Sequence, residues 1–168
     1  MIQKVKGKKY LINGGLGMIG STIATILVEA GAEVTIVDAM VKPFGANLFN
    51  IERIKDKVKT RTFDIKSIKD MKKEIENKDV IFNLAGQIAH NDSIINPLYD
   101  AKLNYLYQLN VMECIRQVNP NAKVIFSGSR LQFGKIKNIP VDESHPSYPE
   151  TPYALHKQTT ENMYQFYN

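Results

Sequence analysis

The sequence NGGLGMIGS, residues 13–21, places four glycines in nine positions, directly after the apolar run Tyr10–Ile12. Inside regular structure glycine costs about 0.5–1 kcal/mol relative to alanine, so such a cluster must provide something that only a bare backbone can. Gly14, Gly17 and Gly20 lie between a predicted strand and a predicted helix. At such a turn a diphosphate can approach the backbone closely, and the amides at the start of the helix favour an anion. The stretch therefore predicts a nucleotide-binding turn, and a simple tight turn is the alternative on glycine spacing alone.

The composition is that of a globular protein of ordinary size. Hydrophobic residues make up 43% and charged residues 23%, and we expect residues 1–168 to form one domain. No apolar stretch approaches the ~20 residues of a membrane-spanning helix, so we expect no membrane partner. The net charge of +5 comes from scattered lysines, which indicates a solvated surface rather than a nucleic-acid partner. The single cysteine, Cys114, excludes an internal disulfide framework, is expected in the core and fits a cytoplasmic location.

Apolar segments of strand length alternate with segments of helix length. Runs rich in β-branched residues predict strands at residues 8–14, 33–39, 58–65, 79–86 and 122–129. The spacing of apolar residues predicts helices at residues 18–30, 47–57, 67–77, 97–118 and from 153 onward. This alternation predicts an α/β fold, a Rossmann-type doubly wound parallel sheet with strand order 3-2-1-4-5. Ser67 and Asp70 predict a capping box at the start of the helix at 67–77.

Asp38 is the residue that makes the nucleotide interpretation more specific. It ends the second predicted strand, about twenty residues after the glycine turn, where an acid can accept hydrogen bonds from an adenosine ribose. Because its carboxylate would repel a phosphate on that ribose, we expect NAD to be preferred over NADP. A methyltransferase, whose glycine-rich turn also precedes an acid, is the alternative on these residues.

The glycine spacing and two later motifs resemble the short-chain dehydrogenase/reductase superfamily. Its glycine turn implies that Gly14, Gly17, Met18, Ile19 and Gly20 contact NAD. The sequence FDI, residues 63–65, resembles the segment that meets the adenine, which implies that Asp64 and Ile65 contact it. The sequence NLAG, residues 83–86, resembles the segment after the fourth strand, which implies that Leu84, Ala85 and Gly86 lie beside the cofactor.

The stretch PVDESHPSYPETPYALHK, residues 140–157, narrows the resemblance to the extended branch of that superfamily, the NAD-dependent nucleotide-sugar epimerases and dehydratases. Tyr153 and Lys157 are four residues apart and so lie on one face of a helix. The resemblance implies that Tyr153 is the base and that Lys157 lowers its pKa and holds the nicotinamide ribose. Counting back from Phe133 and Gly134, it implies that Ser129 orients the substrate hydroxyl. A tyrosine of ordinary pKa near 10 is a poor base at neutral pH, so it needs such a neighbouring cation.

Several residues depart from the family pattern or carry a weaker prediction. Asn13, Gly128 and Phe133 replace a threonine, a serine and a tyrosine, and none of these changes removes a proposed catalytic group. Dehydratases carry an acidic pair after the catalytic serine or threonine, whereas this chain has Arg130 and Leu131, which favours an epimerase or reductase.

Asn104 matches a helix asparagine of the family, and a purely structural role is equally compatible. The three histidines show no metal-ligand spacing, so no metal is expected, and we expect His156 to face away from Tyr153.

The resemblance covers the front half of the usual family length. The final run, residues 159–168, contains no residue that would end a helix, so we expect a sequence cut from a longer one, before the later strands and the lobe that binds the sugar. The expected function is an NAD-dependent nucleotide-sugar epimerase, or a related reductase or dehydratase, working through a 4-keto sugar. A catalytically silent NAD-binding sensor or scaffold is the alternative. The resemblance also implies a homodimer formed through the helices at 97–118 and 153–168.

Overall fold

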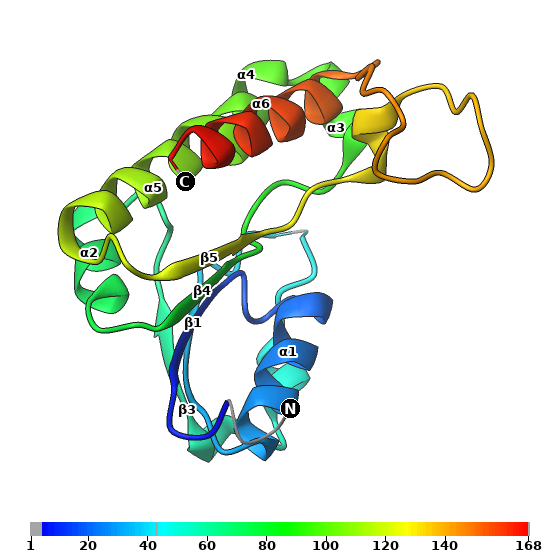
Figure 1. Ribbon diagram of the computed structural model, residues 1–168. Helices are drawn as coiled ribbons and strands as arrows, with labels where there is room; N and C mark the ends of the chain where they lie inside the picture. Colours follow the sequence, from blue (N-terminus) through cyan, green and yellow to red (C-terminus); the bar gives the residue numbers. More distant parts are fainter. Residues whose placement is uncertain (1–4, 43, 168) are drawn as a thin grey trace. The chain divides into compact units, whose positions relative to one another are not determined.

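The structure, a computed structural model, describes residues 5–42 and 44–167. Contacts between Cα atoms divide the chain into two compact units. The sheet unit comprises the residues up to Gly86 together with Asn110–Phe126, and the helical unit comprises Gln87–Leu109 and the residues from Ser127 on (Figure 1). Each unit is built from segments that are distant in the sequence.

Five parallel strands make up the sheet unit. They are β1 (Lys9–Asn13), β2 (Glu33–Asp38), β3 (Val58–Thr62), β4 (Val80–Asn83) and β5 (Lys123–Phe126). Their order is β3-β2-β1-β4-β5, which confirms the predicted order 3-2-1-4-5. β1 is central, and its Ile12 is in register with Ile36 of β2 and Phe82 of β4. The carboxyl ends of β1, β2 and β4 therefore meet at one edge of the sheet, where the glycine turn and Asp38 follow.

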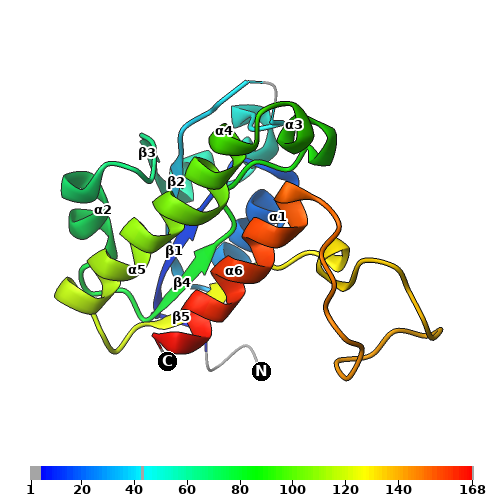
Figure 2. The ribbon, with the colours of Figure 1, turned by 90° about the horizontal axis from the view of Figure 1, so that it is seen from above.

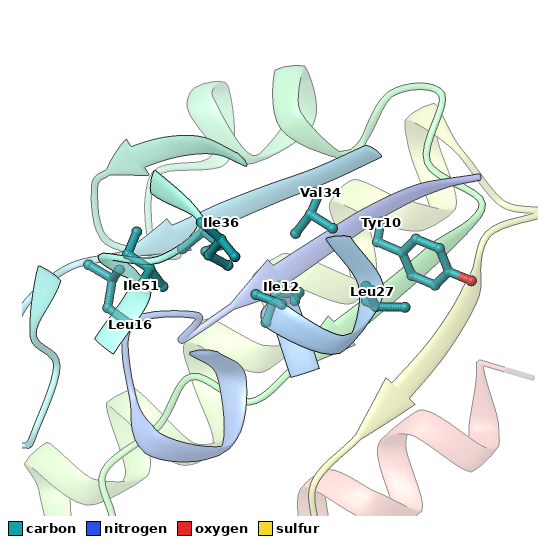
Figure 3. Close-up of a cluster of buried hydrophobic side chains, with 9 residues drawn as sticks. Tyr10, Ile12, Leu16, Leu27, Val34, Ile36 and Ile51 are labelled. Carbon is teal, nitrogen blue, oxygen red and sulfur yellow. The ribbon is translucent and has the colours of Figure 1, made fainter. Parts of the chain in front are cut away.

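One face of the sheet packs against α1 (Met18–Glu29). Alternate residues of a strand point to the same face, so Tyr10 and Ile12 of β1 share a face with Val34 and Ile36 of β2. The core cluster in Figure 3 joins these four side chains to residues of the turn before α1, of α1 itself and of the segment that follows β2, namely Leu16, Ala24, Leu27, Ile51 and Ile54. This cluster fixes the start of α1 against the end of β1.

The opposite face is covered by α2 (Ile68–Ile75) and by α5 (Tyr107–Val118), whose residues from Asn110 on belong to the sheet unit. Seen from above, α1 lies on one side of the sheet and α2 and α5 lie on the other (Figure 2). Cys114 of α5 is buried, as the sequence predicts, and its thiol lies 3.7 Å from the carbonyl oxygen of Ile68. The side-chain amide of Asn119 donates to the carbonyl oxygens of Ile75 and Lys78, which fastens the end of α5 to α2.

The helical unit is built around α6 (Pro152–Phe166). It packs against α3 (His90–Ile95), α4 (Pro97–Ala101), the π-helical turn η4 (Lys102–Leu106) and the 3₁₀ turn η5 (Arg130–Phe133). In both views α6 runs beside α4 (Figures 1 and 2). Thr151 caps α6 by accepting a hydrogen bond from the Ala154 amide, and Pro152 follows at the first helical position, which suits its fixed φ.

The structure corrects several predicted elements. The predicted helix at 97–118 is divided into α4, η4 and α5, and α3 precedes it where no helix was expected. Within η4 the side chain of Asn104 donates to the Gln87 carbonyl and to Asp100. This interaction ties the widened turn to neighbouring segments, which the spacing of apolar residues does not reveal.

Two further predictions are wrong in their local geometry. Residues 47–57 form the 3₁₀ turns η2 (Leu48–Ile51) and η3 (Lys55–Lys57) rather than an α-helix, because Ile51 and Ile54, three residues apart, both enter the core. The predicted capping box at α2 is absent, since the Ser67 hydroxyl donates to the Asp70 carboxylate at 2.6 Å and caps no backbone amide. In the described ranges, no helix is both long and apolar enough to cross a membrane.

The core cluster provides a test of the fold. Replacing Ile12, which is fully buried, by alanine removes buried methyl groups and leaves a cavity. We expect a loss of about 2–5 kcal/mol in the free energy of unfolding. Ile26 of α1 is 60% exposed, so Ile26→Ala is the matched control and should change that free energy by no more than about 0.5 kcal/mol. Urea unfolding measures both, and equal losses would contradict this packing.

Candidate functional site

The glycine turn joins β1 to α1 and also touches the segment after β4. Gly14 has a φ of +77°, a conformation that glycine adopts without strain. A Cβ added to it would lie 2.8 Å from the backbone nitrogen of Ala85, so the chain after β4 passes directly beside the turn. A Cβ on Gly20 would overlap the Gly14 carbonyl, which explains why α1 can approach the turn so closely.

Gly17, directly before α1, differs from Gly14 and Gly20 in that a side chain there would have room. A Cβ there would meet nothing closer than the Gly14 carbonyl oxygen at 3.5 Å, an ordinary contact. Gly17 caps the helix without a side chain, and the first turn carries no acidic residue. The side chains of Met18 and Ile19 are 78% and 55% exposed. Bare amides and the positive end of the helix dipole therefore face outward at this point, which suits a diphosphate.

Asp38 lies at the end of β2 and holds the neighbouring loops through its carboxylate. One oxygen accepts a hydrogen bond from the Leu16 amide at 3.0 Å, and the other accepts from the Met40 amide at 2.8 Å. A carboxylate offers about four lone-pair sites, so acceptor capacity for ribose hydroxyls remains. Asp38 is thus oriented beside the glycine turn, as the sequence predicts.

The other predicted cofactor residues of the sheet unit follow β3 and β4. The Asp64 carboxylate accepts from the Lys66 amide at 3.0 Å and lies 3.5 Å from its ammonium, while Ile65 is buried. The Leu84 amide donates to the carbonyl oxygen of Asn13, which continues the ladder between β1 and β4. The structure thus brings Leu84 and Ala85 to the glycine turn, and Gly86 ends this part of the sheet unit.

Tyr153 and Lys157 lie in the helical unit, one turn apart on α6. Both are largely buried, with exposed fractions of 9% and 8%. The backbone amide of Tyr153 donates to the hydroxyl oxygen of Ser93 at 3.1 Å, and that hydroxyl donates to the carbonyl of His90. Ser93 therefore anchors the start of α6 to α3, a contact that the sequence alone did not reveal.

Ser129 precedes η5, and its side chain is near enough to Tyr153 to lower the pKa of the phenol. The Ser129 hydroxyl oxygen accepts a hydrogen bond from the Leu131 amide at 3.3 Å, so the hydroxyl proton is directed elsewhere. The three residues expected to carry the chemistry therefore belong to one unit. This juxtaposition depends on the pairing of η5 with α6, about 24 residues apart in the sequence.

Gln132 holds Ser129 in place, and the sequence analysis did not identify it. Its side-chain oxygen accepts from the Ser129 amide at 2.5 Å, and its side-chain nitrogen donates to Gln158 at 3.2 Å and Glu161 at 2.5 Å, both on α6. A serine followed three residues later by glutamine is the pattern of a capping box, so the signal was present. Gln132 thereby connects the Ser129 loop to the helix that carries Tyr153.

Burial dominates the ionisation of both α6 residues. It raises the pKa of Tyr153, while the hydrogen bond from Ser129 lowers it and the charge of Asp100 raises it further. Burial lowers the pKa of Lys157 to about 8, against the opposing charges of Asp100 and Glu161. Burial thus brings the pKa of Lys157 closer to the neutral range and moves the pKa of Tyr153 further above it.

Two other predicted residues have defined partners. His156 points to Asp100 of α4, with 2.6 Å between its Nδ1 and the carboxylate. Asn104 is buried in η4 and bonds both Gln87 and Asp100. Over residues 5–42 and 44–167, no three His, Cys, Asp or Glu side chains are grouped closely enough to hold a metal ion.

Comparison with known proteins gives consistent matches over nearly the whole chain. The family model for GDP-mannose 4,6 dehydratase matches residues 11–168. A Methanocaldococcus jannaschii protein, provisionally named a UDP-glucose 4-epimerase, is 34% identical over 160 residues, which are 94% of this chain and 50% of that protein.

Solved structures agree with these matches. A UDP-N-acetylglucosamine 4-epimerase of Methanobrevibacter ruminantium, in complex with UDP-N-acetylmuramic acid, has a TM-score of 0.87 and 29% identity, with coverage of 96% of this chain and 51% of that one. A UDP-glucose 4-epimerase of Thermus thermophilus, in complex with NAD, has a TM-score of 0.84 and 25% identity, with coverage of 95% and 50%. The chain thus spans about half the length of these proteins.

The glycine turn yields a paired prediction. Gly20→Ala places a Cβ against the Gly14 carbonyl and 2.7 Å from the Gly15 Cα, and we expect it to lower the free energy of unfolding by about 1–3 kcal/mol. Gly17→Ala should leave that free energy unchanged within about 0.5 kcal/mol but weaken NAD binding, since its methyl group projects where the diphosphate would approach. Urea unfolding and calorimetric titration separate the two effects. Unchanged NAD affinity in stable Gly17→Ala would remove the diphosphate from this turn.

Proposed function

The chain belongs to the GDP-mannose 4,6 dehydratase family, and we propose that it is the cofactor-binding portion of an NAD-dependent nucleotide-sugar epimerase or a close relative. The family assignment confirms the resemblance to epimerases and dehydratases that the motifs indicate. One observation carries the proposal: Tyr153 and Lys157 are buried one turn apart on α6, and Gln132 ties the Ser129 loop to the same helix.

The sheet unit fits NAD at three points. The uncapped start of α1 and the open space at Gly17 suit the diphosphate, Asp38 suits the adenosine ribose, and Asp64 with Ile65 suits the adenine. Leu84, Ala85 and Gly86 would line the path toward the nicotinamide. NAD is also present in the Thermus thermophilus structure to which the chain is similar. Bound NAD would supply the acceptor for a hydride.

The residues of the helical unit would handle the proton. Oxidation of a sugar hydroxyl to a ketone removes a hydride from carbon and a proton from oxygen. The Tyr153 oxygen, as phenolate, would take that proton, while Ser129 would donate a hydrogen bond to the substrate oxygen and orient it. Because burial raises the pKa of Tyr153 in the chain alone, the phenolate requires positive charge nearby, which the Lys157 ammonium and the nicotinamide ring would provide. Return of the hydride to the other face of the 4-keto sugar, together with return of the proton from Tyr153 to the sugar oxygen, would give the epimer.

Epimerisation or reduction is favoured over dehydration by the residues after Ser129. Elimination of water calls for an acid and a base close to the reacting carbons. This chain carries Arg130 and Leu131 there, and neither can act as a carboxylic acid. Arg130 is exposed and could contact the diphosphate of the substrate. The epimerases among the similar proteins support the same choice.

A catalytically silent NAD-binding module is the second candidate. It is favoured by the coverage of only about half of the similar proteins, because the sugar-binding residues of a whole enzyme would lie outside this sequence. The juxtaposed Ser129, Tyr153 and Lys157 count against it, since a module that only senses NAD has no need of a base. We expect the 168-residue chain to bind NAD and to turn over sugar poorly.

A homodimer of the full-length protein is part of the proposal. The helical unit exposes large apolar side chains on α3, α4, η4 and α6: Ile94, Ile95, Leu98, Leu106 and Leu155. Burying such side chains in an interface between copies would remove them from water. The scattered charge favours no nucleic acid, and the lone Cys114 suits a cytoplasmic location. Sedimentation velocity of the full-length protein distinguishes a dimer from a monomer.

Cofactor choice should depend on Asp38. We expect the chain to bind NAD at least about tenfold more tightly than NADP, and Asp38→Asn to bring the two affinities closer because it removes the charge that repels the extra phosphate. Asp64→Asn is the control: it should weaken both cofactors equally and leave their ratio unchanged. Fluorescence titration with each cofactor gives the ratios. Equal affinities in the wild type would exclude the assigned role of Asp38.

The proton-accepting role of Tyr153 can be tested in the full-length protein with UDP-glucose. Tyr153→Phe removes the hydroxyl and keeps the ring, so we expect NAD to remain bound while turnover falls by at least about a hundredfold. Tyr148→Phe, on an exposed side chain of the loop before α6, is the matched control and should keep turnover. Full activity of Tyr153→Phe would show that another group takes the proton.

A further inference from the structure

Asp100 is a buried acid at the centre of the helical unit that the proposed chemistry does not use directly. It lies on α4 and is only 1% exposed. One carboxylate oxygen accepts from the side-chain amide of Asn104 at 2.9 Å, and the other lies 2.6 Å from the Nδ1 of His156 on α6. A buried carboxylate is costly unless it is hydrogen-bonded and balanced by positive charge, so its presence calls for an explanation.

The Asp100 carboxylate contacts α6 at His156, the residue directly before Lys157, and both Asp100 and Lys157 are buried. From this position its charge acts on both α6 residues of the proposed site. It raises the pKa of Lys157 against the lowering caused by burial, and it raises the pKa of Tyr153. Glu161 is the other acid that raises the pKa of Lys157, and it lies on α6 itself. Asp100 therefore links the two residues electrostatically from a neighbouring helix.

We propose that Asp100 is a positioning residue for the alcohol oxidation: its buried carboxylate, held by His156 and Asn104, keeps Lys157 as the ammonium that Tyr153 requires. The role of Asp100 in alcohol oxidation rests on the proposed function. Its effect on the pKa values of Lys157 and Tyr153 does not, and can be measured without any activity.

Burial lowers the pKa of Lys157 to about 8, so this lysine loses its proton more readily than an exposed lysine does. Removal of the Asp100 charge would lower that pKa further. Loss of the ammonium would remove both the positive charge beside Tyr153 and the donor for the ribose hydroxyls. The rise that Asp100 causes in the pKa of Tyr153 is the accompanying cost, and it is opposed by the hydrogen bond from Ser129.

His156 and Asn104 fix where this charge lies. Asn104 of the π-helical turn η4 donates to Asp100, and His156, which directly precedes Lys157 on α6, contacts the other carboxylate oxygen. Both donors bind the carboxylate oxygens, so the group cannot rotate freely toward solvent. The elements packed against α6 also carry other titratable side chains: His90 and Asp92 of α3, Tyr99 of α4, Lys102 and Tyr105 of η4, and Arg130 of η5.

The test is an NMR titration of the chain labelled with ¹³C at lysine Cε and tyrosine Cζ. The lysine signal that disappears in Lys157→Arg belongs to Lys157, and the tyrosine signal that disappears in Tyr153→Phe belongs to Tyr153. In Asp100→Asn we expect the pKa of Lys157 to fall below its wild-type value and the pKa of Tyr153 to fall as well, because one negative charge is removed from both. Glu161→Gln is the matched control, in which only the pKa of Lys157 should fall.

His156→Ala gives a second and milder change that keeps the carboxylate. Loss of one donor frees the carboxylate to turn away, so both pKa values should move in the direction seen in Asp100→Asn. This variant decides the question if Asp100→Asn does not fold. If Asp100→Asn folds and the pKa of Lys157 is unchanged in it, the proposal is overturned. If only His156→Ala folds, an unchanged Lys157 pKa in that variant overturns it. Absence of sugar turnover by the full-length protein would instead count against the proposed function, so the two failures are distinguishable.

Discussion

Lys157 is buried, and a buried lysine is stable as an ammonium only where opposite charge and hydrogen bonds replace the lost water. Its surroundings explain much of the helical unit. Asp100 and Glu161 supply negative charge, Asn104 and His156 hold Asp100, and Gln132 holds Glu161. Among these contacts, His156 joins α4 to α6, Gln132 joins η5 to α6, and Asn104 joins η4 to α4. The proposed network around Lys157 thus includes Gln132, which also holds the Ser129 loop against α6.

The sheet unit depends on a different constraint, the close approach of bare backbone at one edge. Gly14 lies beside the chain after β4, and Gly20 lets α1 pack against the turn. The core cluster around Ile12 and Ile36 holds this arrangement from one face of the sheet. The groups suited to a nucleotide therefore belong to one unit, and the groups suited to proton transfer belong to the other.

Much of this could be predicted from sequence because the signals are local. Strand order follows from the alternation of apolar segments, and the glycine turn, Asp38, Tyr153 and Lys157 are each read from short spacings. Asp100 and Ser93 could not be assigned in the same way, since their roles arise from contacts with a helix that lies 56–60 residues away in the chain. The capping box of Gln132 with Ser129 is a local signal, but the contacts of Gln132 with α6 are not. The division of the helix at 97–118 by a π turn was missed for the same reason, because Asn104 bonds a distant backbone carbonyl.

A crystal structure of this chain with NAD bound is the most direct test of the account. The account predicts that the diphosphate lies on the amides at Gly17, that the adenosine ribose bonds Asp38, and that the nicotinamide end lies next to the Tyr153 hydroxyl with Lys157 bonded to its ribose. A complex in which the nicotinamide points away from α6, or in which the diphosphate binds elsewhere, would contradict it.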